Sequence, residues 1–204
     1  MRFIGFILSL FFALTTLARN ATELRAFGDV SLNTIYLFSS PNCPHCRNFH
    51  RTIFPELLKR YVKTKRAQIL IVDMVYDEPS IQAAMLMRCL PEEKSQKMMN
   101  WLYENQPRWM ASKDTKNLFL QYVLPQGMTM NEFNRCLNDE ALRDELLSQR
   151  DTLSNLYRVN GWPTMILRQG NSVKQYVGTD RRAVLYSIEA DISAFEQQRN
   201  SQKK

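Results

Sequence analysis

Apolar and polar residues alternate along the chain in a way that predicts a strand, a helix and a second strand. Residues 33–40, NTIYLFSS, are β-branched and aromatic and end in turn residues, which predicts a buried strand. From Pro44 the apolar positions recur every three to four residues, as in an amphipathic helix, and Pro55 must kink or restart that helix because it removes a backbone hydrogen bond. Residues 67–75, AQILIVDMV, predict a second buried strand. The order predicts a βαβ unit with a parallel sheet.

The next stretch, residues 79–157, has helical periodicity throughout and fits roughly three to five helices. Thr129 followed by Glu132 matches a capping box, and Asn138 is expected to cap a further helix. The stretch therefore predicts a helical insertion after the βαβ unit.

The C-terminal part predicts strands again and then a helix. Residues 162–177, WPTMILRQGNSVKQYV, indicate two short strands joined by a Gly-Asn turn. A last helix should begin at Thr179 or Asp180, and the polar tail that ends the chain should be frayed. The predicted class is α/β, in the order βαβ, helical insertion, ββα.

An apolar run at the N-terminus changes how the rest is interpreted. Residues 3–18, FIGFILSLFFALTTLA, follow Met1-Arg2 and are shorter than the ~20 residues of a membrane span. Thr16 and Ala18 are small residues suited to cleavage after Ala18. We expect residues 1–18 to be a cleaved secretory signal, with a retained anchor as the alternative. In an exported protein, four cysteines are most simply two disulfide pairs.

Composition narrows the class of partner. The chain has 204 residues, of which 45% are hydrophobic, enough for one globular domain with a core. Its formal charge of +7 is spread over both halves and permits acidic partners. Since no basic stripe is interleaved with aromatic residues, we expect no nucleic-acid binding.

The segment FSSPNCPHCRNFH, residues 38–50, holds the candidate chemistry. Proline is favoured at the first helical position, so Pro44 makes Cys43 the N-cap, with its sulfur facing the amides of His45 and Cys46. Those amides, the helix dipole and a protonated His45 should lower the pKa of Cys43 below ~8.5. Cys46 lies one turn further on, close enough for a disulfide with Cys43. A stabilised Cys43 thiolate would make that disulfide a good oxidant.

Two other interpretations of the pair are open. The two cysteines could form an inert disulfide. Cys43, Cys46 and His50 also have the spacing of zinc ligands, but a structural site needs a fourth ligand and the chain has no second paired motif. We therefore expect no metal and no cofactor.

The segment NCPHC at a helix start after a strand, together with GWPTMIL at residues 161–167, resembles the DsbA-type thiol oxidases. The resemblance covers Thr34 to Phe195. It implies a thioredoxin fold (βαβ–ββα) with an inserted helical subdomain. With the signal at residues 1–18 and the polar tail at residues 199–204, the first part of this fold would be residues 19–78, the helical insertion residues 79–157, and the second part residues 158–198.

The resemblance also implies roles for the motif residues. Cys43 would be the solvent-facing nucleophile and Cys46 the buried resolving cysteine, with Pro44 and His45 between them. Pro163 would be a cis-proline beside the disulfide, and the backbone around it would pair with an extended substrate peptide.

Gly161, Trp162 and Thr164 would accordingly contact substrate. Trp162 departs from the family, which usually carries Thr or Val there, and its ring should crowd or stack on substrate and shield the disulfide. Leu37 stands where many relatives carry an acid, so a proton for the buried cysteine would need water or another group.

Cys89 and Cys136 fall in the helical insertion. Some relatives join a cysteine pair in similar helical contexts, so the resemblance implies a structural disulfide here. The alternative is two buried free thiols packed as small apolar residues.

The function implied is an exported thiol:disulfide oxidoreductase of the periplasm that donates its Cys43–Cys46 disulfide to secreted proteins with free thiols. A membrane re-oxidase would recycle it. Only Arg19 to Asn33 precede the first strand, which favours a monomer. The alternatives are an isomerase or reductase of the same fold, and a secretion-associated binding or chaperone module with residual redox activity.

Overall fold

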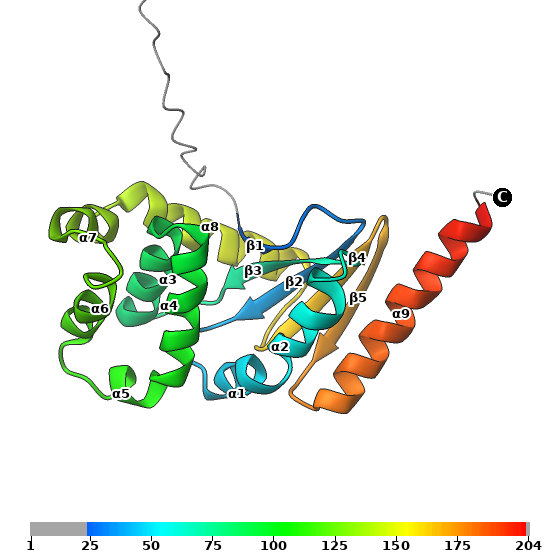
Figure 1. Ribbon diagram of the computed structural model, residues 1–204, viewed down its shortest axis with the longest axis horizontal. Coiled ribbons are helices and arrows are strands. Elements are labelled where there is room, and N and C mark those ends of the chain that lie inside the picture. Colours follow the sequence, from blue (N-terminus) through cyan, green and yellow to red (C-terminus); the bar gives the residue numbers. More distant parts are fainter. Residues whose placement is uncertain (1–23, 203–204) are drawn as a thin grey trace, which may run out of the picture.

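The computed structural model describes residues 24–202, so the expected signal at residues 1–18 lies outside the described part (Figure 1). A five-stranded sheet has the order β1-β3-β2-β4-β5. Strands β2 and β3 are parallel, and the other neighbours are antiparallel. The strands are β1 (Arg25–Phe27), β2 (Asn33–Ser39), β3 (Gln68–Asp73), β4 (Thr164–Gln169) and β5 (Ser172–Val177).

The first βαβ unit has the predicted order. Strands β2 and β3 match the two apolar runs, and they are connected by three consecutive helical segments, namely α1 (Pro44–Thr52), α2 (Phe54–Leu57) and the π-helix η1 (Leu58–Val62). Helix α1 ends at Thr52 with Ile53 as its C-cap, and Pro55 is the second residue of α2. Proline thus restarts the helix where the sequence predicted a break.

Strand β1 was not predicted. It is only three residues long and pairs antiparallel with β3 at the edge of the sheet. Its Arg25 is buried, and the guanidinium lies 2.9 Å from the carboxylate of Asp73. Arg88 lies 3.3 Å from the same carboxylate. Three residues are too few to show the alternation of a strand, and a charged residue is normally expected at the surface. The burial of Arg25 depends on partners far away in the sequence, which no local pattern reveals.

The insertion contains six helices rather than three to five: α3 (Glu78–Cys89), α4 (Glu92–Glu104), α5 (Gln106–Met110), α6 (Thr115–Val123), α7 (Met130–Leu137) and α8 (Glu140–Leu156). The capping box of Thr129 and Glu132 begins α7 as predicted. The cap of α8 is Asp139, whose side chain accepts a hydrogen bond from the amide of Leu142. Asn138 instead ends α7, so its prediction as an N-cap was wrong by one residue.

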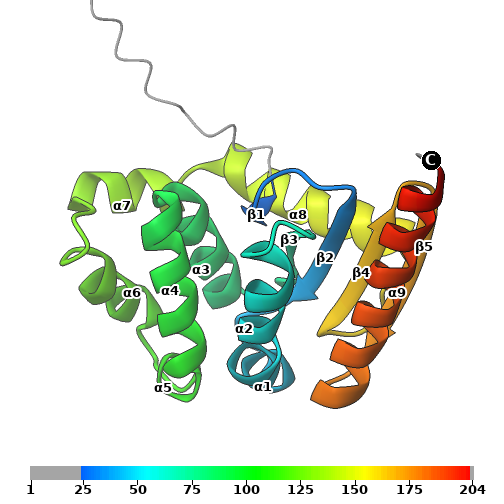
Figure 2. The same cartoon turned by 45° about the vertical axis from the view of Figure 1, so that its right-hand side comes forward.

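Helices cover both faces of the sheet. Helices α1, α2 and α9 (Arg181–Gln202) lie on one face, and α8 runs across the other (Figure 2). Strand β2 serves both layers: Ile35 and Leu37 belong to the larger core, whereas Phe38 joins Val72 and Ile166 in the smaller core near α8. Burial on both faces explains why the strand is an almost continuous apolar run.

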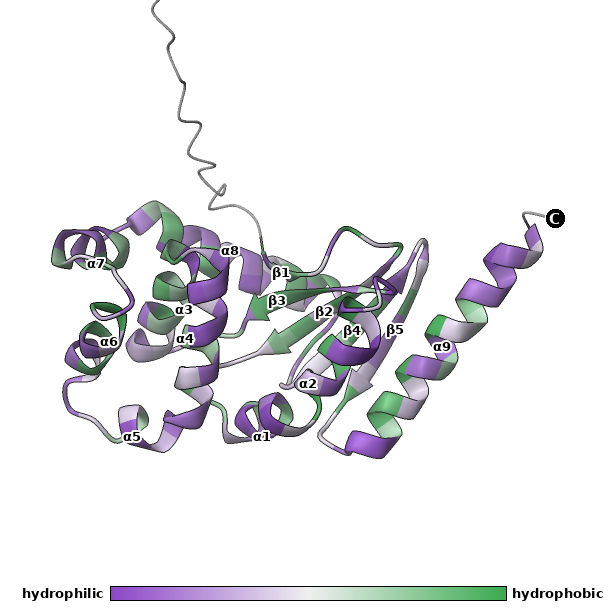
Figure 3. Ribbon diagram, in the orientation of Figure 1, coloured by the Kyte–Doolittle hydropathy of each residue, from purple (hydrophilic) through white to green (hydrophobic). Residues whose placement is uncertain are grey.

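The polar tail expected from residue 199 is not a separate segment. Helix α9 continues to Gln202, although its last turns are largely hydrophilic (Figure 3). Its buried residues all lie at or before Ile192, ahead of the hydrophilic last turns: Val184, Leu185, Ile188 and Ile192.

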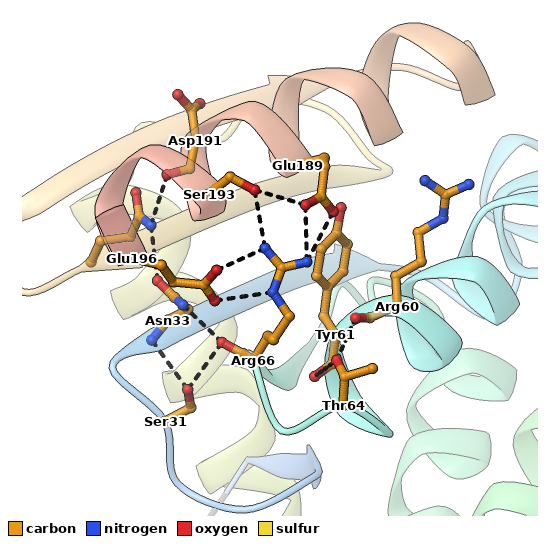
Figure 4. Close-up of polar contacts among 11 residues, drawn as sticks. Ser31, Asn33, Arg60, Tyr61, Thr64, Arg66, Glu189, Asp191, Ser193 and Glu196 are labelled. Atoms are coloured by element: carbon orange, nitrogen blue, oxygen red, sulfur yellow. Dashed lines mark hydrogen bonds and ion pairs between the residues drawn. The ribbon is translucent and has the colours of Figure 1, made fainter. Parts of the chain in front are cut away.

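An arginine holds the middle of α9 against the rest of the molecule (Figure 4). Arg66 precedes β3, and its guanidinium donates to Glu189 at 2.9 Å, to Glu196 at 2.9 and 3.0 Å, and to Ser193 at 3.2 Å. Hydrogen bonds in this forked geometry fix the helix more tightly than a single ion pair would.

Candidate active site

The loop between β2 and α1 places Cys43 as the N-cap of α1, as predicted. Cys43 has extended backbone angles, φ −88° and ψ 121°, and Pro44 is the first helical residue. The amide of Cys46 donates to the Cys43 sulfur at 3.4 Å. The sulfur therefore occupies the position in which Ser or Asp caps other helices.

These surroundings favour the anionic form of Cys43. They lower its pKa from 9.0 to about 6, chiefly because the thiol of Cys46 donates a hydrogen bond to it. Partial burial opposes the shift, while the amides of Cys46 and His45 and the charge of His45 add to it. The helix start thus has the predicted effect, but the largest contribution comes from the second cysteine.

Cys46 is fully buried, and its pKa is raised. The hydrogen bond to Cys43 is the main cause, followed by burial. The amide of Ser40, which donates to the Cys46 sulfur at 3.4 Å, and the hydroxyl of Ser39 act in the opposite direction. Cys43 is thus a half-exposed thiol that ionises readily, and Cys46 is a buried thiol that resists ionisation.

Two hydroxyl groups occupy the interior beside Cys46. The oxygens of Ser39 and Tyr103 are 2.8 Å apart, and both residues are buried. Leu37, where an acid was expected from the resemblance, packs in the apolar core. The polar neighbours of Cys46 therefore come from the end of β2 and from α4.

The helical insertion also holds the loop that precedes α1. Gln106, buried at the start of α5, donates to the carbonyl oxygens of Pro41 at 2.7 Å and Cys43 at 3.0 Å. Arg47 on α1 donates to the carbonyl of Tyr103 at 2.9 Å. Sequence reasoning missed these residues, because no local pattern relates a glutamine to a loop 65 residues away.

Residues 161–164 lie beside the cysteine pair. The peptide bond between Trp162 and Pro163 is cis, and the carbonyl oxygen of Trp162 is 3.7 Å from the Cys43 sulfur. The hydroxyl of Thr164 donates to the carbonyl of Gly161 at 2.7 Å and closes the turn before β4. The structure thus brings the two sequence motifs together.

The ring of Trp162 lies against a partner in its own chain. It stacks on Tyr76 with ring centroids 5.2 Å apart and an interplanar angle of 13°. Tyr76 follows β3 and was not singled out by the sequence. That Trp162 crowds or stacks on substrate stays a prediction.

His50, the third ligand in the zinc interpretation, has other partners. Its Nε2 lies 2.9 Å from the side-chain oxygen of Asn100, and its ring stacks on Tyr103 and Phe54. Burial lowers its pKa to about 4, so the ring is neutral at neutral pH. Within residues 24–202 no three metal-ligating side chains are grouped together.

The other two cysteines form a disulfide. Cys89 at the end of α3 and Cys136 near the end of α7 are joined with an S–S distance of 2.06 Å. The free-thiol alternative does not apply. This bond connects two helices of the insertion.

Comparison with known proteins gives one family and one fold. The family model described as Thioredoxin matches residues 28–178. A Rickettsia felis protein named "putative protein-disulfide oxidoreductase" is 28% identical over 142 residues, which are 69% of this chain and 51% of that protein. A similarly named Rickettsia typhi protein is 25% identical over 79% of this chain and 61% of its own length. The chain thus spans about half to three fifths of these relatives.

Solved structures agree on the fold. The chain is similar to Wolbachia pipientis alpha-DsbA1, with a TM-score of 0.77 and 17% identity over 86% of this chain and 94% of the other. It is also similar to Chlamydia trachomatis DsbA, with a TM-score of 0.67 and 16% identity over 86% of this chain and 92% of the other. The predicted thioredoxin fold with a helical insertion is confirmed.

Proposed function

Because the chain belongs to the thioredoxin family and has the fold of the DsbA proteins, we propose that it is a protein-disulfide oxidoreductase that donates its Cys43–Cys46 disulfide to the thiols of exported proteins. The observation that carries the proposal is the difference between the two sulfurs. Cys43 is half-exposed with a pKa of about 6, and Cys46 is buried with a raised pKa. Lowering the pKa of one sulfur stabilises the reduced pair, so the disulfide becomes the better oxidant.

The reaction has two exchanges. A substrate thiolate attacks the Cys43 sulfur of the oxidised pair; the bond to Cys46 breaks, and Cys46 leaves with the electron pair and takes up a proton. The second substrate thiolate then attacks the substrate sulfur of this mixed disulfide and releases Cys43 as a thiolate. The substrate loses two electrons and the protein gains them. A low pKa makes Cys43 a fast leaving group in the second exchange.

The segment before β4 is the proposed binding surface. The Trp162 carbonyl lies next to the Cys43 sulfur, so a peptide bound through its backbone along Gly161, Trp162 and Pro163 would bring its cysteine to Cys43. The hydrogen bond of Thr164 to Gly161 keeps this segment in shape.

We place this activity in the periplasm of a bacterium, with residues 1–18 as the export signal and a membrane re-oxidase as the recycling partner. The Cys89–Cys136 disulfide supports an oxidising compartment, since such bonds are rare in the cytosol. No helix between residues 24 and 202 has the length and apolar character that a membrane crossing requires.

The direct test mixes the oxidised protein with a reduced peptide that carries two cysteines. We expect oxidised peptide and reduced Cys43–Cys46 in equal amounts, as measured by mass spectrometry after alkylation. In Cys46→Ala, Cys43 is first converted to a mixed disulfide with thionitrobenzoate; a peptide with one cysteine should then displace thionitrobenzoate and stay bound through a mixed disulfide. Cys43→Ala, treated in the same way, should trap none because its remaining thiol is buried. Peptide that stays reduced would contradict the proposal.

The redox state of the pair in cells separates the alternatives. An oxidase keeps Cys43–Cys46 oxidised at steady state, while an isomerase or reductase keeps it reduced. Thiols trapped by alkylation in growing cells would show which applies. A binding or chaperone module without redox activity would capture no partner through Cys46→Ala.

A further inference from the structure

An exposed aromatic residue stands next to the cysteine pair. Tyr76, in the loop between β3 and α3, is 57% exposed. Its ring stacks on Trp162, and the guanidinium carbon of Arg150 lies 4.5 Å from the same ring centroid. We call these three side chains the aromatic platform. They come from three different segments: a loop, the turn before β4, and α8.

Hydrogen bonds of Arg150 hold the platform in place. Arg150 donates from Nη1 to the carbonyl of Val75 at 2.6 Å, and from Nε and Nη2 to Asp151 at 2.7 and 3.0 Å. Val75 immediately precedes Tyr76, so the arginine fixes the backbone as well as contacting the ring. A ring held in this way loses little conformational freedom when a ligand binds.

Two separate contacts connect the segments that carry the platform to the segment that carries Cys43. The side-chain amide of Asn42, the residue before Cys43, donates to the carboxylate of Asp77, the residue after Tyr76. On the other side, the carbonyl of Trp162 lies 3.7 Å from the Cys43 sulfur. The ring that stacks on Tyr76 therefore belongs to the same segment before β4 along which the proposed substrate chain binds.

We propose that the aromatic platform is a substrate subsite that binds an aromatic or large aliphatic side chain next to the target cysteine. This inference rests on the proposed function and adds a preference among substrates. Tyr and Trp rings favour stacked or edge-to-face contacts with another ring. A substrate lysine or arginine is disfavoured, because Arg150 already lies against the Tyr76 ring and would repel a second cation.

The test compares three reduced peptides, each with two cysteines, which differ only in having Phe, Ala or Lys next to one cysteine. Their second-order rates of oxidation by the oxidised protein are measured in stopped flow. We expect the Phe peptide to react roughly two- to thirteenfold faster than the Ala peptide, the range for one aromatic pair. The Lys peptide should not exceed the Ala peptide.

Variants locate the preference. Tyr76→Ala should bring the Phe-to-Ala ratio close to one, and Tyr76→Phe should keep it. Tyr186→Ala is the matched control: this tyrosine is 79% exposed on α9, in a pocket lined by Arg60 and Glu189 and by neither cysteine, and its removal should leave the ratio as in the wild type. The rate with dithiothreitol, a small thiol that cannot reach both sites, reports that the disulfide is intact in each variant.

The outcomes separate the two proposals. Equal oxidation of all peptides by the wild type, or a ratio that survives in Tyr76→Ala, overturns the aromatic platform and leaves the oxidoreductase. A faster Lys peptide also overturns it. If dithiothreitol reduces the protein but no peptide is oxidised, the proposed function is wrong and the subsite falls with it.

Discussion

Cys43 and Cys46 carry the same side chain, but the position of each in the first turn of α1 moves its pKa in the opposite direction. Cys43 caps the helix at the surface and receives hydrogen bonds, whereas Cys46 donates one from the interior. Capping by Cys43 and the proline at the first helical position both follow from the sequence alone. The hydrogen bond between the thiols has the largest effect and requires the folded turn.

Titration of Cys43 should make the stability of the reduced protein depend on pH. The folded pKa of about 6 lies below the unfolded value of 9.0, so between these pH values the unfolded state binds more protons. The free energy of unfolding of the reduced protein should therefore rise from pH 6 to pH 9 relative to that of the oxidised protein. Above this range the raised pKa of Cys46 reverses the slope.

Urea unfolding of both redox forms at several pH values measures this dependence. Reduced Cys43→Ser should lose the rise between pH 6 and pH 9, because it has no titrating group at that position. A parallel pH dependence of the reduced and oxidised wild-type proteins would contradict the assigned thiolate.

Ser39 should assist the first exchange. Its hydroxyl lowers the pKa of Cys46, which must leave as an anion when substrate attacks Cys43. Loss of one such hydrogen bond should raise the activation free energy by about 1 kcal/mol, so Ser39→Ala should oxidise peptide roughly fivefold more slowly. Stopped-flow rates with Tyr103→Phe provide the control, since that variant keeps the serine hydroxyl and should be slowed less. Equal rates in Ser39→Ala and the wild type would exclude the role.

At the scale of elements, strands and helices with a local apolar pattern are predicted well, whereas those that depend on a single polar residue are predicted badly. Strands β2 and β3 and the helix from Pro44 follow from apolar runs and from proline, because burial there depends on neighbours in sequence. Strand β1 has no such pattern: the buried Arg25 forms an ion pair with Asp73, 48 residues away in the sequence. The boundary between α7 and α8 was placed one residue too early because Asn138 and Asp139 are both good caps.

Gln106 should contribute to the stability of the turn that begins α1. In Gln106→Leu the carbonyl of Pro41 loses its donor, while the carbonyl of Cys43 still accepts from the amide of Arg47. An unsatisfied buried group costs about 1–3 kcal/mol, and we expect that loss in urea unfolding. Gln121→Leu, at an exposed position on α6, is the matched control and should change stability by less than about 0.5 kcal/mol. Equal effects of the two substitutions would remove Gln106 from this role.

At the scale of the molecule, the site is assembled by segments far apart in sequence. The cysteine motif and the proline motif were recognisable in the sequence, and their proximity followed from the expected fold. The residues that surround them come from the insertion and from the β3–α3 loop: Tyr76, Asp77, Tyr103 and Gln106. Asp77 caps α3 locally, but the contact that each of the four residues makes near the site spans a long sequence separation, so no local pattern predicts it. The insertion is therefore part of the active site as well as a cover for the sheet.

The Cys89–Cys136 disulfide should stabilise this insertion. It joins α3 to α7 across a sequence separation of 47 residues, so it restricts the unfolded chain over a long loop. Removing it in Cys89→Ala/Cys136→Ala should lower the free energy of unfolding by roughly 2–4 kcal/mol. The measurement is best made in a Cys43→Ala/Cys46→Ala background, where this is the one disulfide left among residues 24–202. In that background the parent should lose stability in strong reductant and the variant should not respond. If the parent and the variant unfold at the same urea concentration under oxidising conditions, the bond does not stabilise the fold, and the packing of α3 against α7 is sufficient without it.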